Sequence, residues 1–451
     1  MTEVVLGEDA VARLAARAAA EGWAGALVVM DANTLAAAGV SVVEALRGAG
    51  VAVDEFVFAE RSGLLAGPDE AGAVAARLGG ASWLPVAVGS GVITDIVRYA
   101  AHGAGRDFVS VPTAASMDGY ASGVAAMQVE GVKVTYPARA PVAIYADPRV
   151  AAAAPAELTR AGLGDLLAKA TAGVDWLAAH LLYGEAYDAG AVELVSDPLR
   201  FASLSADRVM AGEPAAVAEL LEGLIGSGTA MARAGSSRPA SGCEHHASHF
   251  WDLLAAHGRR PHESHGLQVG YATRFAMRLQ RFAFGGGVAT LRAPAWPADP
   301  LGPEARAWLG DPVAPEIADA VAAKQRFVAH HLADDRHHLG DDRHILGDDR
   351  HMLGDDRHIR GQPGPGWPAS QGEWEEVRRR IAPAMARFDD VEVALDVAGI
   401  PRGPGWLGLD ADTLRATFRY ATRLRARYTV LDFLEGQSVL QEAVEAALAQ
   451  T

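Results

Sequence analysis

The first 120 residues of the chain alternate short apolar runs with amphipathic stretches, and no other feature constrains the fold as strongly. The apolar runs have the length of strands and cover Ala24–Asp31, Val51–Phe58, Trp83–Val88 and Phe108–Val111. Helical patterns follow these runs, through Leu46, over Asp69–Leu78 and from Gly91 onward. Strands that alternate with helices form a parallel sheet, because each helix carries the chain back across one face. We therefore expect an α/β fold with a parallel sheet and helices on both faces.

From about Pro155 the pattern becomes almost wholly helical. Helical spacing of apolar residues extends over Glu157–Leu182, Glu185–Leu194, Asp197–Ala211 and Pro214–Ser227, and strand candidates of comparable quality do not return. A chain of 451 residues also exceeds one typical domain. The sequence thus predicts an α/β domain over residues 1–154 and an all-α domain over residues 155–451. A cleft between two such domains is the expected place for ligands.

Composition argues against several classes of partner. The net charge of −16 disfavours nucleic acid and anionic membranes. The single cysteine, Cys243, excludes an intrachain disulfide and a thiolate zinc site. The N-terminus has no basic region followed by an apolar run, and no uncharged apolar segment reaches membrane-spanning length without several glycines. We expect a cytoplasmic protein.

Residues Asp334–Gly361 consist of four tandem heptads, DDRHHLG, DDRHILG, DDRHMLG and DDRHIRG. A seven-residue period suggests a coiled coil, but each unit carries two aspartates and a glycine. Glycine within a helix costs about 1 kcal/mol relative to alanine. A low-complexity insertion that lengthens a surface loop fits the composition better. Its histidines are expected to bind metal only adventitiously.

The stretch Ser237–Gly266 holds six of the fifteen histidines. His245 and His249 are four residues apart in a helical pattern, so both project from one face, and His265 follows after a short loop. Two neutral imidazoles and one carboxylate form a three-ligand metal site with a position open for substrate. A solvated cluster of surface histidines explains the same residues, so the stretch alone leaves both interpretations open.

Two loops after consecutive predicted strands indicate a nucleotide site. Val88–Asp95 (VGSGVITD) opens a helix, where glycines and free N–H groups can hold a pyrophosphate; a plain tight turn is the alternative. Val111–Ser122 (VPTAASMDGYAS) is a polar loop of small residues. Neighbouring strand ends with such loops form the crevice in which open α/β sheets bind ligands. Together they predict a Rossmann-like dinucleotide-binding domain.

Two aspartates are candidates for the carboxylate of the metal site. Asp118 lies in the second loop, where aspartate is also common in turns. Asp165, in GLGDLLAK, lies early in a long predicted helix, where a helix N-terminus favours a carboxylate in any case. Asp165 belongs to the same helical part as the histidines, so it is the better-placed candidate.

Six motifs in order along the chain carry a family resemblance: GSGVITD, FVSVPTAASMDGYAS, GLGDLLAKATAGVDW, SRPASGCEHHASHFWD, HGLQVG and RLRARYTVLDFLEG. Together they resemble the sn-glycerol-1-phosphate dehydrogenases. That family is a branch of the superfamily of iron-containing alcohol dehydrogenases and dehydroquinate synthase-like enzymes. The likeness covers nearly the whole chain apart from roughly residues 290–368.

The resemblance implies roles for individual residues. NAD or NADP would be bound by Gly91, Val92, Ile93, Thr94, Asp95, Thr113, Ala114, Ala115, Ser116 and Ser122. The metal ligands would be Asp165, His245 and His265. Substrate would be bound by Asp118, Asp165 and His249, of which Asp165 and His249 are the expected catalytic residues. The chain departs from the family at Cys243, where serine is usual, and at Arg98, where lysine is frequent, and the interval between His245 and His265 is a few residues longer than in archaeal members.

The resemblance also implies a reaction: the reversible reduction of dihydroxyacetone phosphate to sn-glycerol 1-phosphate by a nicotinamide cofactor. A divalent ion would polarise the ketone, with zinc expected and nickel or iron as alternatives. We expect His249 to donate or relay the proton. Arg238 is a candidate for binding the phosphate, although an outward-facing arginine that caps the loop is an equal alternative. A homodimer or larger homo-oligomer is expected.

Three other functions compete with this one. The first is a related dehydrogenase that acts on another small polyol or phosphorylated ketone. The second is a cyclase of the dehydroquinate synthase type; a glutamate usually takes the carboxylate ligand position in that branch, so Asp165 favours the dehydrogenase. The third is a non-catalytic metal-binding or scaffolding protein in which the heptads of residues 334–361 are the functional part.

Overall fold

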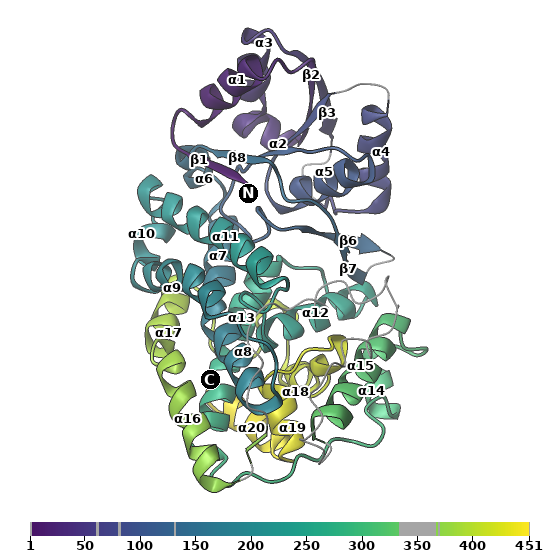
Figure 1. Ribbon diagram of the computed structural model, residues 1–451, viewed down its shortest axis with the longest axis vertical. Coiled ribbons are helices and arrows are strands. Elements are labelled where there is room, and N and C mark those ends of the chain that lie inside the picture. Colours follow the sequence, from purple (N-terminus) through teal and green to yellow (C-terminus); the bar gives the residue numbers. More distant parts are fainter. Residues whose placement is uncertain are drawn as a thin grey trace, which may run out of the picture.

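The computed structural model describes residues 2–59, 63–79, 83–129, 132–332, 367–368 and 370–450. An N-terminal α/β part lies at the top of Figure 1, and a larger helical part lies below it. The heptads of residues 334–361 fall outside the described residues. None of the helices in the described ranges has both the length and the apolar character that a membrane crossing requires.

Six strands form a parallel sheet in the order β1-β8-β5-β4-β2-β3, and β6 and β7 form an antiparallel hairpin beside it. The strands are β1 (Glu3–Leu6), β2 (Gly25–Asp31), β3 (Ala52–Phe58), β4 (Leu84–Val88), β5 (Val109–Val111), β6 (Val124–Val129), β7 (Val132–Pro137) and β8 (Ala143–Ala146). From β2 the chain continues to β3, which lies on one side of β2 at the edge of the sheet. From β4 it continues to β5, which lies on the opposite side, toward β8 and β1. The crevice where such connections diverge is the usual ligand site of an open sheet, and the turn after β4 lies at its edge.

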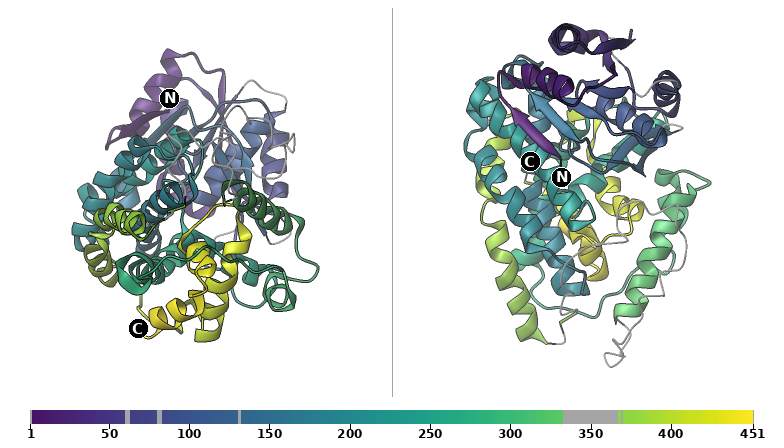
Figure 2. Two further views of the ribbon diagram at one scale, coloured as in Figure 1. Left: turned by 60° about the horizontal axis from the view of Figure 1, so that its bottom comes forward. Right: turned by 45° about the horizontal axis from the view of Figure 1, so that its top comes forward.

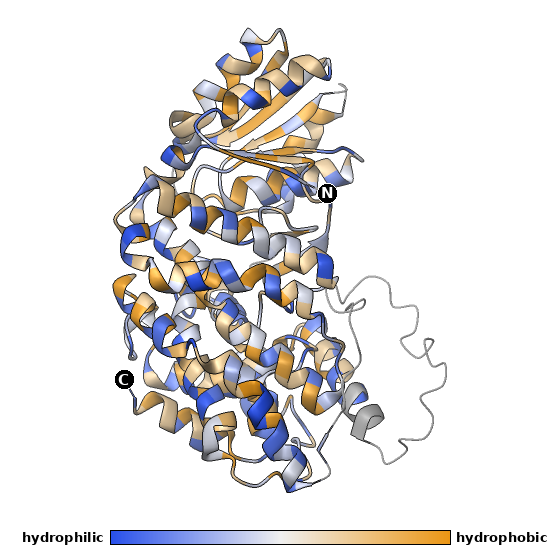
Figure 3. Cartoon of the chain, turned by 60° about the vertical axis from the view of Figure 1, so that its left-hand side comes forward, coloured by the Kyte–Doolittle hydropathy of each residue, from blue (hydrophilic) through white to orange (hydrophobic). Residues whose placement is uncertain are grey.

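Helices cover both faces of the sheet (Figures 1 and 2). They are α1 (Ala10–Ala20), α2 (Ala32–Thr34), α3 (Val40–Gly48), α4 (Pro68–Leu78) and α5 (Gly91–Gly103), with a π-helical turn at Leu35–Gly39. Side chains of β2 alternate between the faces: Val28 and Met30 pack with α1 and α3, while Leu27 and Val29 pack with α4 and α5. The central strands β2 and β4 are almost wholly apolar because both faces are covered (Figure 3), whereas the edge strand β3 carries Asp54 and Glu55. The predicted α/β fold with a parallel sheet is confirmed.

After β8 the described chain is helical. The helices are α6 (Pro148–Ala152), α7 (Ala156–Leu167), α8 (Lys169–Tyr183), α9 (Ala189–Leu204), α10 (Ala206–Met210), α11 (Pro214–Ala234), α12 (Cys243–Ala256), α13 (His265–Phe282), α14 (Pro303–Leu309), α15 (Pro315–Leu332), α16 (Gln371–Met385), α17 (Phe388–Val397), α18 (Ala411–Tyr420), α19 (Val430–Gly436) and α20 (Leu440–Leu448), with a π-helical turn at Ala283–Gly287 and 3₁₀ turns at Trp406–Gly408 and Ala421–Leu424. The predicted helical character of this part is confirmed. The domain limits at residues 154 and 155 stay a prediction.

The predicted single helix Glu157–Leu182 is in fact two helices, α7 and α8, that meet at Ala168. The hydroxyl oxygen of Thr171 lies 3.0 Å from the Ala168 carbonyl oxygen at this junction. Asp165 therefore lies in the last turn of α7 rather than early in a long helix. A helix N-terminus does not explain this aspartate.

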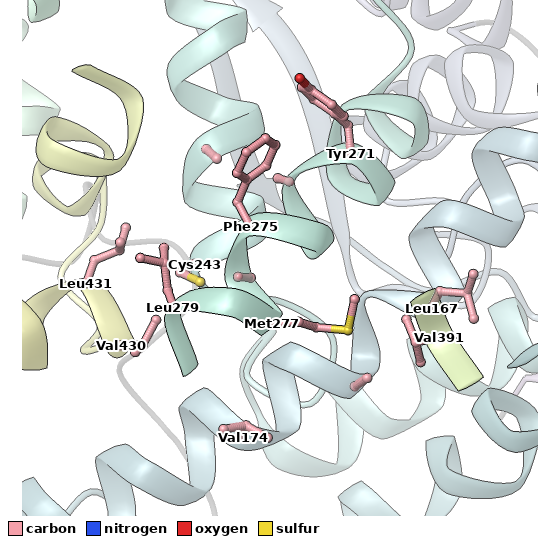
Figure 4. Packing of buried hydrophobic residues seen from close by; sticks show 14 of the residues in the cluster. Leu167, Val174, Cys243, Tyr271, Phe275, Met277, Leu279, Val391, Val430 and Leu431 are labelled. Carbon is pink, nitrogen blue, oxygen red and sulfur yellow. The ribbon is translucent and has the colours of Figure 1, made fainter. Parts of the chain in front are cut away.

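Helix α13 runs through the centre of the helical part. Its residues Tyr271, Phe275, Met277 and Leu279 are fully buried and pack against side chains of several surrounding helices (Figure 4). Every residue of α13 from Gly266 to Gln280 is buried, so other elements surround this helix on all sides. The first residue of α13, His265, is consequently anchored on a rigid element at the edge of the core.

Candidate active site and metal centre

The three predicted metal ligands converge where three helices meet. Asp165 lies in the last turn of α7, His245 in the first turn of α12, and His265 begins α13. One ligand atom of each lies within 4.8 Å of the others, and His245 Nε2 is 3.7 Å from Asp165 Oδ1. Donors on one zinc ion, each at about 2.0–2.1 Å from it, lie on the order of 3.3 Å apart in a tetrahedral site. The donor set and spacing therefore fit a divalent ion with one position left open.

Glycines bring the ligand-bearing helices into main-chain contact. A Cβ at Gly164 would lie 2.6 Å from the Gly266 carbonyl oxygen, and a Cβ at Gly266 would lie 2.1 Å from the Ala161 carbonyl oxygen. Any larger residue at either position would force α7 and α13 apart. Asp165 and His265 are the sequence neighbours of these two glycines, so the close helix crossing is what brings them together.

Both imidazoles that are predicted to bind the metal are oriented through Nδ1. His245 Nδ1 lies 2.9 Å from Glu244 Oε1, and His265 Nδ1 lies 3.1 Å from Ser248 Oγ. Glu244 is fixed in turn by the Thr171 hydroxyl, which donates to Oε2 at 2.8 Å. Burial raises the pKa of Glu244, but the hydrogen bond and charge of His245 together with main-chain hydrogen bonds outweigh burial and lower that pKa. A partner on Nδ1 leaves Nε2 of each ring available to a metal ion.

A buried lysine joins the two candidate carboxylates. Lys169 Nζ donates to Asp118 Oδ2 at 2.6 Å and to Asp165 Oδ1 at 3.0 Å, and the Asp118 main-chain N–H donates to Asp165 Oδ2 at 3.0 Å. Burial disfavours the charged ammonium, yet the two carboxylates outweigh burial and raise the pKa of Lys169. Lys169 thus lets the two acidic groups lie side by side, and it fixes Asp118 beside the metal ligands.

A cavity of about 650 Å³ is lined by His245 and His265, the two histidines predicted to bind the metal. The predicted site residues that line it are Gly91, Val92, Asp95, Ser116, Asp118, Ser122, His245, His249 and His265. Five predicted cofactor residues are at most 6% exposed and are not among the lining residues: Ile93, Thr94, Thr113, Ala114 and Ala115. The role of these five in cofactor binding stays a prediction.

Arg98 connects helix α5, which lines part of the cavity, to the loop after β5. Its guanidinium is bound to Asp95 at 2.5 Å and donates to the carbonyl oxygens of Gly119 and Tyr120 at 2.6 and 2.9 Å. Arg98, where the family frequently has lysine, is therefore a buried side chain that connects two parts of the chain. It holds the loop that carries Asp118 against the predicted cofactor-binding turn.

Arg238 does not lie where a phosphate-binding residue should. Its side chain is fully buried in an ion pair with Glu185, and it donates to the Tyr428 carbonyl oxygen at 2.7 Å. Arg238 is not among the residues that line the cavity. The prediction that Arg238 binds phosphate is wrong, because the guanidinium is already paired with the carboxylate of Glu185. The alternative of an outward-facing arginine is wrong as well.

The remaining histidines of the cluster fall into two groups. His257 and His262 are exposed, as expected, although His262 also lines the cavity. His246 is fully buried, and neither of its ring nitrogens has a hydrogen-bond partner among the described residues. Burial holds the pKa of His246 well below its usual value, and nearby cations add to this effect: Lys324, Arg427, Arg425 and Arg238. His246 is thus a neutral packing residue.

The sequence analysis overlooked two residues of the site, Lys169 and Glu244. Lys169 is four residues after Asp165, and this spacing on a helix is a recognisable signal for a charge pair. Glu244 precedes His245 directly, and adjacency alone does not show that its carboxylate turns back to the imidazole. The hairpin β6–β7, also unpredicted, contributes Val124 and Thr135 to the cavity wall.

A second cluster of potential ligands, Asp175, Cys243 and Glu244, lies fully buried behind the first. Asp175 accepts hydrogen bonds from the main-chain N–H groups of Cys243 and Val430 at 2.7 and 3.0 Å, and from Gln280 at 2.8 Å. Burial, followed by the charge of Glu244, raises the pKa of Asp175 to about 7. These contacts make Asp175 a structural junction of α8, α12, α13 and α19.

Comparisons with known proteins identify the family of the chain. The family model of iron-containing alcohol dehydrogenases matches residues 5–155. The glycerol-1-phosphate dehydrogenase (NAD(P)+) of Halalkalibacterium halodurans is 37% identical over 285 residues, which are 62% of this chain and 71% of that protein. The enzyme of the same name from Pyrococcus furiosus is 42% identical over 188 residues, 42% of this chain and 53% of that protein.

Solved structures show the same fold. An iron-containing alcohol dehydrogenase from Thermococcus thioreducens aligns with a TM-score of 0.60 over 100% of this chain and 99% of that chain, at 14% identity. Structural similarity at 14% identity supports the architecture alone. The 37% identity to the Halalkalibacterium halodurans enzyme extends over 71% of that protein and therefore supports the family. The chain therefore belongs to the glycerol-1-phosphate dehydrogenases, a branch of the iron-containing alcohol dehydrogenase superfamily.

Proposed function

We propose that the protein catalyses the reversible, NAD(P)-dependent reduction of dihydroxyacetone phosphate to sn-glycerol 1-phosphate, a precursor of glycerophospholipids. One observation carries the proposal: a carboxylate and two imidazoles lie within 4.8 Å of one another beside a cavity that the predicted cofactor-binding turn also lines. A ketone reductase of this type requires both groups within reach of one substrate. The two glycerol-1-phosphate dehydrogenases that resemble the chain support the choice of substrate.

Asp165, His245 and His265 would hold a divalent ion, for which zinc is the first candidate. When bound, the ion polarises the ketone oxygen and the nicotinamide supplies the hydride. The wall formed by Gly91 and Ser116 would hold the cofactor next to these ligands. Asp118, fixed by Lys169, would accept a hydrogen bond from a substrate hydroxyl.

The product oxygen must gain a proton, and His249 is the proposed donor. His249 lies one turn after His245, lines the cavity, and has its ring centre 5.8 Å from that of His265. Loss of a general acid costs about 10²- to 10⁴-fold in rate. We expect His249→Ala to lower kcat in this range and to flatten the pH–rate profile, whereas His257→Ala, outside the cavity, changes neither. An unchanged profile in His249→Ala would exclude the role.

The function is tested with metal-reconstituted protein, dihydroxyacetone phosphate and each reduced cofactor in turn, followed by chiral analysis of the product. We expect net oxidation of NADH or NADPH and formation of sn-glycerol 1-phosphate. A cyclase would consume no reduced cofactor. A dehydrogenase for an unphosphorylated polyol would prefer dihydroxyacetone to its phosphate.

The same preparation tests the finer expectations. We predict zinc in the metal centre, which elemental analysis of the purified protein measures. We predict a homodimer or larger homo-oligomer, which sedimentation analysis measures. The relative rates with NADH and NADPH give the cofactor preference. A cytoplasmic location stays a prediction.

A further inference from the structure

The active-site cavity has a wall of hydroxyl and guanidinium groups that comes from the helical part. Its lining includes Ser237, Ser241, Arg425 and Arg427 next to His245. Both arginines belong to the segment that connects the 3₁₀ turn after α18 to α19. Ser241 precedes His245 by four residues, so this wall lies beside the metal ligands.

Arg427 is held firmly in this wall. Its side chain is buried, Nη1 donates to the Ser241 carbonyl oxygen at 3.0 Å, and Nη2 donates to Ser237 Oγ at 2.7 Å. These bonds fix the plane of the guanidinium, which still lines the cavity. Arg425 is half-buried and lines the same cavity. Two guanidinium groups on one wall suit a dianion, because their N–H forks match the oxygens of a phosphate.

Other arginines of this region have different tasks. Arg98 is the third arginine among the described lining residues, but it is bound to Asp95 and to carbonyl oxygens on the side of α5. Arg238 is paired with Glu185 and lies outside the lining. The positive charge of the wall beside α12 therefore comes from Arg425 and Arg427.

We propose that Arg425 and Arg427 bind the phosphate group of the substrate and make the enzyme prefer a phosphorylated ketone to its unphosphorylated counterpart. The location is suitable, because Arg427 donates to the carbonyl oxygen of Ser241, four positions before His245 in the chain, and lines the same cavity as His245. In dihydroxyacetone phosphate three bonds separate the ketone carbon from phosphorus. The assignment rests on the proposed reduction of that substrate.

The test compares Arg427→Lys and Arg425→Gln with the wild-type enzyme. KM is measured for dihydroxyacetone phosphate and for dihydroxyacetone, and binding of sn-glycerol 1-phosphate is measured by calorimetry. We expect each variant to raise KM for the phosphorylated ketone and to weaken calorimetric binding by about 10- to 100-fold, as for the loss of a hydrogen bond to a charged group. We expect KM for dihydroxyacetone to change by less than about 2-fold, because that substrate has no phosphate to lose contact with.

Arg423→Lys is the matched control. Arg423 lies in the adjoining 3₁₀ turn, two residues before Arg425, and is buried like Arg427, but it is paired with Glu435 and lines a different cavity. We expect it to leave both KM values within about 2-fold, provided that all variants melt cooperatively and bind metal as the wild type does. Arg425→Gln keeps the test decisive if Arg427→Lys misfolds, because Arg425 is only half-buried.

Equal changes of KM for both ketones, or no change for either, would overturn the proposal while the dehydrogenase assignment stands. A wild-type enzyme that does not reduce dihydroxyacetone phosphate would instead refute the proposed function. Calorimetry still decides the role of the arginines in that case. Binding of sn-glycerol 1-phosphate that Arg425→Gln weakens supports the phosphate site, and undiminished or absent binding refutes it.

Discussion

We expect Glu244 to act on the predicted metal site through His245 rather than as a ligand of its own. Its carboxylate lies 2.9 Å from His245 Nδ1 and so holds the ring with Nε2 available to a metal ion. Loss of such a partner commonly costs 10- to 100-fold in metal affinity. We expect Glu244→Gln, which keeps the shape but not the charge, to weaken zinc binding by about 10-fold or more, measured by competition with a chelator.

The control is Asp175→Asn, which alters a carboxylate of the same buried cluster. Asp175 bonds to the main chain of Cys243 and Val430 rather than to His245. Its replacement should leave the zinc affinity near that of the wild type at constant pH. Equal losses in Glu244→Gln and Asp175→Asn would mean that the cluster acts only through folding.

Asp175 also makes the stability depend on pH. Its pKa is raised to about 7 in the folded protein, while an unfolded chain has a value of about 3.9. The folded state therefore holds a proton that the unfolded state releases between these values, so this group lowers stability as pH rises from about 4 to about 7. Each unit of pKa difference corresponds to about 1.4 kcal/mol.

We expect Asp175→Asn to gain stability relative to the wild type as pH rises from 5 to 8, because the amide has no proton to lose. Urea denaturation of the metal-free proteins at both pH values measures this difference. Other titrating groups contribute alike to both proteins and cancel. A difference between the two proteins that stays constant with pH would contradict the prediction.

At the scale of elements, the crossing of α7 and α13 brings two of the predicted metal ligands together. The two helices touch through Gly164 and Gly266, and the neighbours of these glycines are the predicted ligands Asp165 and His265. A Cβ at Gly164 would lie 2.6 Å from a main-chain oxygen, and no flexible side chain can move aside to admit it. The same crossing supports the core of the helical part and the geometry of the ligands.

We expect Gly164→Ala to destabilise the protein by about 1–3 kcal/mol through overpacking and to weaken metal binding as the ligands separate. Gly173 in α8 gives a matched control, since a Cβ there meets nothing within 4 Å. Gly173→Ala should be neutral or stabilising by up to about 1 kcal/mol, because alanine favours helices. Melting temperature and zinc content report both effects. Equal behaviour of the two variants would show that the crossing is not tight.

At the scale of the whole molecule, the cavity lies where the sheet part meets the helical part. Its described lining comes from α5, the loop after β5, the β6–β7 hairpin, α11–α13 and the segment before α19. Each of these elements is anchored in its own core, because α5 belongs to the sheet's helical cover and α13 to the centre of the helical part. The reaction proposed for this cavity needs both parts, since one would hold the cofactor and the other the metal.

The heptads of residues 334–361 offer a test of the alternative in which they carry the function. All the predicted catalytic, cofactor and metal residues lie before α14, far from the heptads in sequence. We expect deletion of residues 334–361 to leave reductase activity within about 2-fold, as for surface changes away from functional sites. Loss of activity with metal content and melting temperature preserved would favour the alternative.

The alternation of apolar runs and helical patterns was enough to predict the parallel sheet, because strands and helices are set largely by residues close in sequence. Four strands were predicted, and β1, β6, β7 and β8 were not. Among the strands that were not predicted, β1 and β8 have only four residues each, too few to show the alternation of apolar and polar residues that marks a strand. The break at Ala168 was missed for a similar reason, since the amphipathic pattern continues through it.

The sequence by itself determined the fold class and, through motif resemblance, the candidate ligands Asp165, His245 and His265. Tertiary structure alone decided which charged groups serve the site. Lys169 meets Asp118 across 51 positions, and Arg427 meets Ser241 across 186. Arg238 was predicted for the phosphate, but Glu185, 53 positions away, takes its guanidinium. Local sequence carries periodicity and turn chemistry, whereas the partner of a buried charge is set by which helices cross, and that depends on the packing of the whole chain.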